Sequence, residues 1–322
     1  MRAVRCREFG PPEALSIEEV PDPVPGPGQL VIDVRATAVT FPDALMIEDQ
    51  YQGSVELPYT PGGEAAGVVR EIGAGVEAFR VGDFVVAGGS GGFAEQLLAE
   101  VRNVRAIPPG VEFAEATGLL YSHGTAYYGL KHRGALQPGE SLLVLGGGGN
   151  VGLAAVEVGK LLGARVIAAA STPEKLALCR ERGADELIDY SQEDLKVRAK
   201  ELTGGRGADV VYDPVGGEYA EQALRATAWQ GRYLVIGFTA GIPSVPLNLP
   251  LLKGCQVIGV FFGRAMAQQR EALDEIMDTL LAHAAKGELR PVVSHRYSLD
   301  EAPQALADLK GRRVVGRVVV EP

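Results

Sequence analysis

The chain has 322 residues with a net charge of −10, and hydrophobic residues make up 46% of it. This length predicts two domains, each large enough to bury its own core. An acidic surface disfavours nucleic acid and anionic membranes as main partners, because both are bound through basic patches.

The cysteines and the apolar runs exclude further classes of protein. Cys6, Cys179 and Cys255 lie far apart and form no C-x-x-C pair, which argues against a disulfide framework and against a cysteine metal site. No apolar run reaches the roughly 18 residues of a membrane span, and the first residues lack the apolar core of a signal peptide. We therefore expect a cytoplasmic enzyme or binding protein.

The first part of the chain, up to residue 121, has the pattern of short strands. Residues 30–39, 66–73 and 83–87 are rich in β-branched side chains, with polar residues spaced between them. Prolines and glycines separate these segments and indicate turns. Short strands with such turns predict a compact, barrel-like β domain.

The second part alternates between apolar segments and helical segments. The candidate strands are residues 141–146, 165–170, 186–190, 209–213, 233–237 and 256–262. The helical segments between them are residues 150–163, 172–183, 193–203 and 218–229. Nearly all-apolar strands are typical of parallel strands covered on both faces, so the pattern predicts an α/β domain with a doubly wound sheet of six strands.

This domain is expected to span residues 122–263. A helix at 267–286 and a last strand at 314–320 follow it. We assign them to the first domain, which then consists of residues 1–121 and 264–322.

The turn after the first apolar strand carries the motif G-x-G-x-x-G, formed by Gly147, Gly149 and Gly152. At the turn between the first strand and first helix of an alternating domain, this motif indicates dinucleotide binding. Side chains in the turn would block a pyrophosphate, whereas the helix start offers backbone N–H groups and a positive dipole end. The third glycine lets helix and strand pack closely. Asn150 either caps the helix start or reaches a phosphate.

The end of the second strand distinguishes the two nicotinamide cofactors. An NAD-binding protein usually carries Asp or Glu there, but this chain has Ser171 and Thr172. Lys175, one turn into the next helix, and Tyr190, at the end of the third strand, are placed to bind a 2′-phosphate. The sequence therefore favours NADPH over NADH, with a solvated helix lysine as the alternative for Lys175.

Zinc ligands are missing from the pattern. Medium-chain alcohol dehydrogenases combine a β domain with a dinucleotide-binding domain and hold a catalytic zinc through cysteine and histidine. Here Cys6 is the only cysteine of residues 1–121, and neither it nor His123 has a partner at ligand spacing. No four-cysteine loop is present either. We therefore expect chemistry without zinc.

Several motifs together resemble one family over essentially the whole chain. They are F-P-D at 41–43, Y-T-P-G-G-E-A-A-G-V-V at 59–69, G-T-A-Y-Y-G-L at 124–130, the glycine motif, and V-Y-D-P-V-G-G at 211–217. With them the chain resembles the zinc-free quinone oxidoreductase, or zeta-crystallin-like, branch of the medium-chain dehydrogenase/reductase superfamily. H-R-G-A-L-Q-P-G-E at 132–140 is similar to its quinone oxidoreductase-like protein 2 type. The resemblance implies a GroES-like domain beside a Rossmann domain, with NADPH as cofactor.

The resemblance also implies roles for single residues. The glycine turn would hold the pyrophosphate, Thr125 would lie near the nicotinamide, and backbone after two later strands would pass beside it. For Asp213, ribose contact and a turn cap are comparable alternatives. The expected cofactor-binding residues are Thr125, Gly147, Gly148, Gly149, Asn150, Val151, Gly152, Ser171, Lys175, Tyr190, Asp213, Gly237, Phe238, Phe261, Phe262 and Gly263.

Four residues of the first domain are candidates for catalysis in the cleft between the domains: Thr40, Asp43, Tyr51 and Glu64. Tyr51 either polarises a carbonyl and passes a proton or simply packs. Glu64 and Asp43 either act in the site or are structural carboxylates bound to backbone or to an arginine. A satisfied, partly buried histidine is the better interpretation of His123.

The predicted function is NADPH-dependent reduction of quinones or α,β-unsaturated carbonyl compounds. The alternatives are an enoyl-thioester reductase and an NADPH-binding protein with little turnover, as in a crystallin. The apolar last strand at 256–262 would form an exposed sheet edge, which predicts a homodimer paired through it.

Overall fold

The computed structural model describes all 322 residues. Its contacts divide the chain into two compact units, Met1–Tyr121 with Leu281–Pro322, and Ser122–Leu280. The return crossing falls within helix α10 (Arg270–Ala285), whereas the sequence placed it after residue 263. No helix is both long enough and apolar enough to cross a bilayer.

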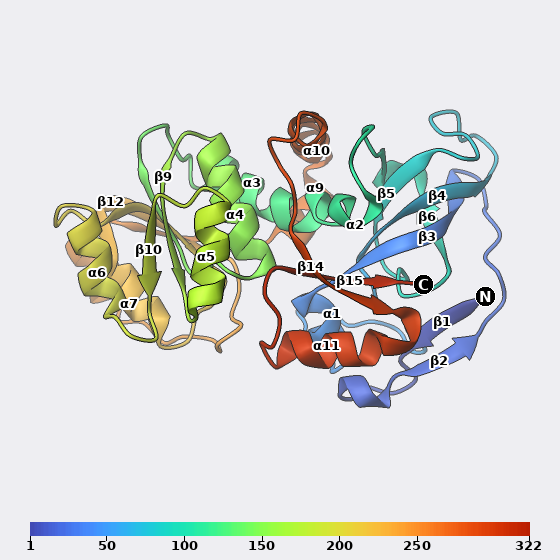
Figure 1. Ribbon diagram of the computed structural model, residues 1–322, viewed down its shortest axis with the longest axis horizontal. Helices are drawn as coiled ribbons and strands as arrows, with labels where there is room; N and C mark the ends of the chain where they lie inside the picture. Colours follow the sequence, from blue (N-terminus) through green and yellow to red (C-terminus); the bar gives the residue numbers. More distant parts are fainter. The chain divides into compact units, whose positions relative to one another are not determined.

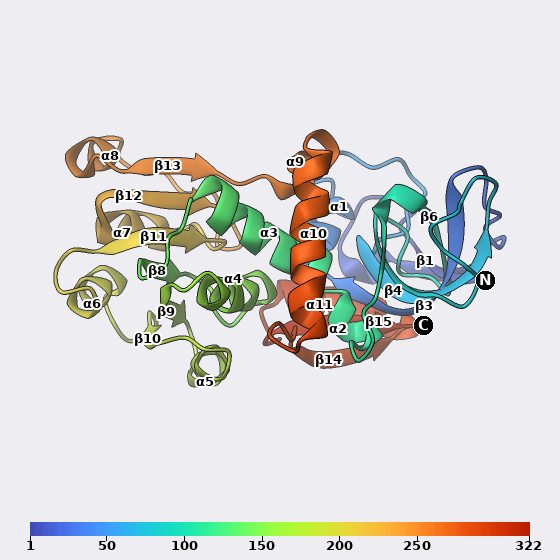
Figure 2. The same ribbon diagram turned by 90° about the horizontal axis from the view of Figure 1, so that it is seen from above.

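The unit Ser122–Leu280 is built on a six-stranded sheet in which every neighbouring pair is parallel. Its strands are β8 (Ser141–Val144), β9 (Arg165–Ala170), β10 (Glu186–Asp189), β11 (Ala208–Asp213), β12 (Thr227–Val235) and β13 (Gln256–Gly259). Figure 2 shows them in the order β10-β9-β8-β11-β12-β13, with β13 at an outer edge. This is the strand order of a Rossmann domain, so the predicted fold class is confirmed.

Helices cover both faces of this sheet. Figures 1 and 2 show α4 and α5 on one face and α6 and α7 on the other. The helices are α4 (Asn150–Leu161), α5 (Pro173–Glu181), α6 (Leu195–Leu202), α7 (Tyr219–Ala226), α8 (Asn248–Lys253) and α9 (Phe262–Gln268). The central strands are buried on both faces, which is why they read as apolar runs in the sequence.

A further helical run leads into this sheet. It consists of the π-helical turn Leu119–His123, helix α3 (Gly124–Tyr127) and a second π-helical turn, Tyr128–Arg133. Two π-helical segments on either side of one turn of α-helix are uncommon, and such segments are frequent at functional sites.

Several predicted elements have other boundaries, and β12 begins at Thr227 where the strand was expected at 233–237. The helix expected at 218–229 ends at Ala226, because Thr227 already pairs with Ala208 and begins β12. The strand expected at 256–262 ends at Gly259, and Phe262 begins α9. The helix expected at 267–286 is two helices, interrupted at Gln269, whose ψ of 60° is not helical.

The other unit contains a two-stranded sheet and a seven-stranded sheet of order β14-β15-β3-β4-β5-β7, with β6 on β3. The predicted strands at 30–39, 66–73 and 83–87 are β3 (Gln29–Val39), β4 (Glu64–Ile72) and β5 (Phe84–Gly88). The other strands are β1 (Arg2–Arg5), β2 (Ser16–Glu19), β6 (Gln96–Glu100), β7 (Val104–Ala106), β14 (Val293–Ser298) and β15 (Arg317–Glu321).

The end of the chain lies in this unit. β15 replaces the strand predicted at 314–320 and pairs antiparallel with β3. The helices here are α1 (Phe41–Met46), α2 (Phe113–Ala116) and α11 (Ala302–Lys310). Leu299, Ala302 and Leu306 pack into one apolar cluster with Val39 and Ile47, so both ends of the chain share a core.

Candidate functional site

The glycine motif forms a tight turn between β8 and α4. Gly149 is the N-cap of α4, and Gly152 lies in its first turn. A Cβ atom on Gly152 would lie 2.1 Å from the carbonyl oxygen of Gly146, so only glycine allows the helix to approach the turn this closely. A Cβ on Gly147 would lie 2.9 Å from Sγ of Cys179. These two glycines are therefore required by packing within the protein.

Gly149 differs from its neighbours. It is exposed, and a Cβ atom there would meet only the Gly146 carbonyl oxygen, at 3.4 Å. The absence of a side chain at Gly149 therefore leaves open space at the start of a 12-residue helix. Backbone N–H groups and the positive dipole end at such a start attract phosphate. The turn fits a pyrophosphate.

Asn150 and Val151 are the first two residues inside α4. Because Gly149 is the N-cap, Asn150 occupies the first position inside the helix and not the N-cap position. Both residues are partly exposed, so their N–H groups lie at the same open end of the helix as Gly149.

Ser171, Lys175 and Tyr190 gather beside this turn. Ser171 follows β9, and the N–H of Tyr190 donates to the carbonyl oxygen of Ala170, the last residue of that strand. Thr172 caps α5 by accepting from the N–H of Lys175. A Cβ atom on Gly148 would lie 2.4 Å from Cβ of Lys175, which places this lysine directly over the glycine turn.

Tyr190 also packs in the protein interior. Its ring lies 4.5 Å from that of Tyr219, and it is half-buried against the core of the sheet. No acidic residue follows β9 directly, since Glu174 lies inside α5. Ser171 and Tyr190 thus lie at the ends of neighbouring strands, and Lys175 lies over the glycine turn.

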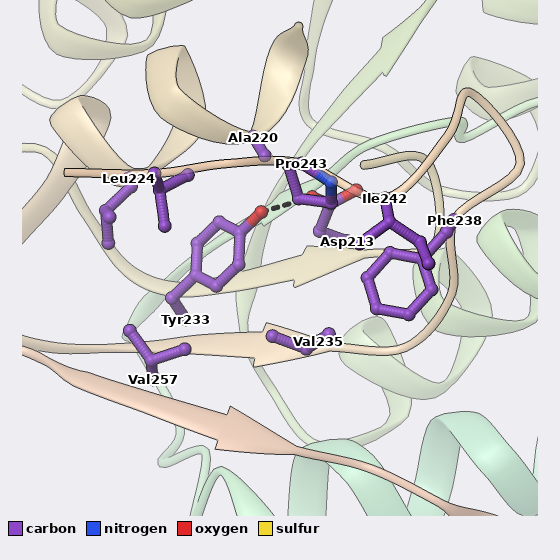
Figure 3. Close-up of a pocket in the computed structure, with 10 residues that line it drawn as sticks. Asp213, Ala220, Leu224, Tyr233, Val235, Phe238, Ile242, Pro243 and Val257 are labelled. Carbon is purple, nitrogen blue, oxygen red and sulfur yellow. Dashed lines mark hydrogen bonds between the residues drawn. The ribbon is translucent and has the colours of Figure 1, made fainter. Parts of the chain in front are cut away.

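Asp213 ends β11 and is committed to the protein itself. Its Oδ1 accepts hydrogen bonds from the N–H groups of Val215 and Gly216 at 2.7 and 2.9 Å. The hydroxyl of Tyr233 donates to its other oxygen (Figure 3). Burial raises the pKa of Asp213, and these three donors oppose the rise. Of the two alternatives for Asp213, the geometry is that of the turn cap.

A cavity of about 170 Å³ lies beside this pair (Figure 3). Its lining is apolar and includes Leu224 of α7, Val235 of β12 and Val257 of β13. It lies on the α7 side of the sheet, whereas the glycine turn leads into α4 on the other face. The cavity is therefore separate from the glycine turn.

The remaining cofactor candidates follow β12 and β13. Gly237 and Phe238 follow β12 and pack on the turn after Asp213, since a Cβ on Gly216 would lie 3.2 Å from the Phe238 ring. Phe261 is exposed, whereas Phe262 is only 4% exposed. Phe261, Phe262 and Gly263 begin α9 and do not continue a strand as expected.

Thr125 is the single residue of the run 122–130 that is not buried. A Cβ atom on its neighbour Gly124 would lie only 2.7 Å from the ring of Phe262. The tight packing around Thr125 therefore leaves its side chain as the accessible group of this run.

Asp43 and Thr40 organise the loop structure of the other unit. Oδ2 of Asp43 accepts from the N–H and the hydroxyl of Thr40, which precedes α1. Oδ1 accepts from the N–H of Gly62 at 3.0 Å. Asp43 is 1% exposed, and burial raises its pKa against the pull of these donors. Asp43 thus holds α1 to the Gly62 turn.

Glu64 has a similar arrangement at the start of β4. Its carboxylate oxygens accept from the N–H groups of Leu120 and Tyr121 at 2.8 and 3.3 Å. Burial raises the pKa of Glu64 to about 8, although the guanidinium of Arg317 and the two N–H groups oppose the rise. Arg317, itself 2% exposed, donates to the carbonyl oxygen of Thr117. The geometry is that of the structural carboxylate among the alternatives for Glu64.

Tyr51 and Tyr121 lie near these carboxyl groups. Tyr51 is half-buried, and burial and the charge of Asp43 raise its pKa. Burial also raises the pKa of Tyr121, whose ring lies where Gly63 and Gly88 lack side chains. Sequence reasoning missed Tyr121 and Arg317, because only the fold brings them to Glu64.

The structure contains no group of three or more His, Cys, Asp or Glu side chains placed to hold a metal ion. The cysteines lie apart in the chain: Cys6 and Cys179 are buried, and Cys255 is half-buried.

Comparisons with known proteins identify both halves of the chain. The family described as "Alcohol dehydrogenase GroES-like domain" matches residues 26–109, and the family described as "Zinc-binding dehydrogenase" matches residues 150–281. The chain is 37% identical over 328 residues to the quinone oxidoreductase-like protein 2 homolog of Nematostella vectensis, covering 99% of this chain and 88% of that protein. It is 38% identical to quinone oxidoreductase-like protein 2 of Bos taurus, covering 99% and 92%.

Solved structures of quinone oxidoreductases have the same fold over the whole chain. The crystal structure of Escherichia coli quinone oxidoreductase complexed with NADPH superposes with a TM-score of 0.93 and 28% identity, covering 100% of both chains. A mycobacterial protein, also complexed with NADPH, superposes with a TM-score of 0.92 and 32% identity over 100% of both chains.

Replacing Glu64 by Gln tests whether burial keeps this carboxyl group protonated. With a pKa of about 8 in the fold and 4.5 as its ordinary value, Glu64 retains a proton in the folded chain over a range where the unfolded chain has lost it. Stability then falls as pH rises between these values, by up to about 1.4 kcal/mol per pH unit from this group. Glu64→Gln lacks this titration, so its free energy of unfolding should decline less.

Urea unfolding at several pH values between about 5 and 8 measures the difference. The lost acceptor oxygen adds an offset that does not depend on pH, so the slope is the relevant quantity. Parallel curves for the wild type and Glu64→Gln would contradict the raised pKa.

Proposed function

This chain belongs to the medium-chain dehydrogenase/reductase superfamily, and we propose that it is an oxidoreductase that uses NADPH to reduce quinones or α,β-unsaturated carbonyl compounds. The observation that carries the proposal is the glycine turn before α4 with Lys175 lying over it. A pyrophosphate at Gly149 would place the adenosine ribose toward the ends of β9 and β10, where Ser171 and Tyr190 lie.

Three features favour NADPH over NADH. No carboxylate follows β9 directly, so the usual partner of a free ribose 2′-hydroxyl is missing. The lysine over the turn supplies a positive charge for a 2′-phosphate, and Ser171 and Tyr190 supply hydroxyl groups. Two solved neighbours of this fold are complexed with NADPH.

When bound, NADPH supplies the hydride for the reaction. The chain's own contribution is to bind and orient. Gly147, Gly148, Gly149, Asn150, Val151 and Gly152 would hold the pyrophosphate. Thr125, Gly237, Phe238 and the backbone at Phe261, Phe262 and Gly263 would lie toward the nicotinamide. Asp213 would act indirectly, because its carboxylate caps the turn that follows β11.

Tyr51 is the proposed proton donor to the reduced acceptor. Unlike the buried Asp43 and Glu64, Tyr51 is partly accessible, and its hydroxyl can donate a proton. Thr40, Asp43 and Glu64 would act by holding α1 and the backbone at Leu120, which makes them positioning residues. That the acceptor binds between the two domains stays a prediction from the sequence.

We also propose that the reaction proceeds without zinc. The support is the residue inventory: the first domain has the single cysteine Cys6, whose thiol donates to the carbonyl oxygen of Glu8. His123 is bound to Glu157 instead of standing among possible ligands.

A homodimer paired through β13 completes the proposal. β13 ends the six-stranded sheet, so one side of it has no strand neighbour. Large apolar side chains are exposed on and around it: Trp229, Ile242, Leu247, Leu251, Leu252, Val257 and Phe261. An exposed apolar edge invites pairing, and a two-fold axis would let each copy cover the other.

Steady-state oxidation of NADPH against a panel of acceptors tests the activity. We expect turnover with quinones or α,β-unsaturated ketones, and a loss of kcat of about 100-fold or more in Tyr51→Phe. A clear preference for crotonyl-CoA would identify an enoyl-thioester reductase instead. Binding of NADPH without turnover of any acceptor would contradict an enzymatic role.

Replacing Lys175 by Ala tests the choice of cofactor. Losing a charge-assisted contact should raise the dissociation constant for NADPH about 10- to 100-fold and leave that for NADH within about twofold. Lys131→Ala, at an exposed lysine of the same unit, is the matched control. Equal losses for both cofactors on isothermal titration would refute contact with the 2′-phosphate.

Replacing Val257 by Lys tests the dimer. Val257 lies on the edge strand with 49% of its surface exposed, and a charge there should prevent pairing and give a monomer in sedimentation. Val197→Lys, at a 45% exposed valine of α6, should leave the dimer intact. A monomeric wild-type chain at micromolar concentration would overturn the dimer.

A further inference from the structure

Three ionisable side chains meet inside the unit Ser122–Leu280. Nε2 of His123 lies 2.7 Å from Oε2 of Glu157, and Nη1 of Arg182 lies 3.7 Å from Oε1 of the same carboxylate. The side chain of His123 is 2% exposed, that of Glu157 9% and that of Arg182 22%. Glu157 therefore bridges an imidazole and a guanidinium in a largely dry environment.

Each member of this network is joined along the chain to a residue of the proposed cofactor site. Glu157 lies on α4, about two helical turns after the glycine turn. Arg182 is the C-cap of α5, the helix that begins beside Ser171 and carries Lys175. His123 ends the first π-helical turn and comes two residues before Thr125. Figures 1 and 2 show α3 beside α4.

The segment with Thr125 is held from two sides. On one side the imidazole of His123 is bound to α4 through Glu157. On the other, Gly124 is packed so tightly that a Cβ atom would lie 2.7 Å from the ring of Phe262 and 3.1 Å from Cε of Met277. Thr125, the partly exposed residue of this run, therefore has little freedom relative to the glycine turn.

Stability alone is a weak reason for such a network. A buried ion pair contributes little or nothing relative to apolar packing of the same volume, because both charges lose their hydration. What it provides is geometry, since a buried carboxylate that loses its partners is strongly penalised. The network therefore penalises any shift of His123 along α4.

We propose that His123, Glu157 and Arg182 are positioning residues that fix Thr125 relative to the glycine turn, and so orient the nicotinamide end of the bound cofactor. The inference rests on the proposed function, which places the pyrophosphate at Gly149 and the nicotinamide near Thr125. Hydride transfer needs the reacting atoms about 3–3.5 Å apart, and a misplacement of about 1 Å can cost about 100-fold in rate. The network acts through Thr125 and touches no substrate.

Cofactor fragments separate positioning from general stability. 2′,5′-ADP reaches the glycine turn and the Ser171–Lys175 region but lacks the nicotinamide. In Glu157→Ala we expect its dissociation constant to stay within about twofold of wild type, while that of NADPH rises about 5- to 10-fold and kcat falls about 10- to 100-fold. Isothermal titration and stopped-flow oxidation of NADPH measure these values on the full chain.

Conservative variants guard against a simple folding defect. Glu157→Gln keeps an acceptor oxygen for His123 and removes the charge that faces Arg182, so most of kcat should return. His123→Asn should behave like Glu157→Ala. Glu181, whose side chain is 66% exposed, also pairs with Arg182. Glu181→Gln removes this carboxylate and should leave both dissociation constants and kcat unchanged.

The outcomes decide between the two roles. Parallel weakening of NADPH and 2′,5′-ADP, or a lower melting temperature with unchanged kcat, would show a purely structural network and overturn the proposal. If the wild-type chain reduces no acceptor, the proposed function fails, but the binding contrast between NADPH and 2′,5′-ADP still tests the network. The positioning role of the network would then be rejected if the dissociation constants of NADPH and 2′,5′-ADP had the same ratio in wild type and in Glu157→Ala.

Discussion

The close backbone contact between Gly152 and the carbonyl oxygen of Gly146 is the constraint on which the dinucleotide-binding unit depends. It lets α4 start directly at the turn, and the turn lies beside β9, since a Cβ on Gly147 would meet Ala168. Any side chain at Gly152 would push the helix away. The neighbouring Gly149 then leaves the end of the helix open, where phosphate binding is favourable. The same turn thus serves both packing and binding.

The other unit depends on buried carboxyl groups for its order. Asp43 and Glu64 are at most 1% exposed, and both accept hydrogen bonds from backbone N–H groups of loops or π-helical turns. Such groups need partners, because an unpaired buried carboxylate is costly. They therefore hold irregular backbone in place. In this arrangement Tyr51 is left as the candidate for proton transfer.

The sequence predicted the architecture well where local pattern and tertiary environment agree. The six-stranded parallel sheet of the Rossmann unit follows from the alternation of apolar strands with helices, and the glycine motif lies where the sequence placed it. The predicted element boundaries were wrong where pairing between strands outweighed the local helix propensity. Thr227 joins β12 because Ala208 offers a neighbouring strand, and residues 228–231 bulge out between two paired stretches. Such a bulge has no signature in a single chain.

The sequence by itself determined the fold class, the phosphate turn and the absence of an acid after β9, because these depend on residue type and short spacing. Only the tertiary structure decided the roles of buried ionisable groups. Asp213 became a turn cap, Glu64 a partner of Leu120 and Tyr121, and His123 a partner of Glu157. In these three cases the donor and the carboxylate are up to 57 positions apart in the chain, and local sequence holds no record of such contacts.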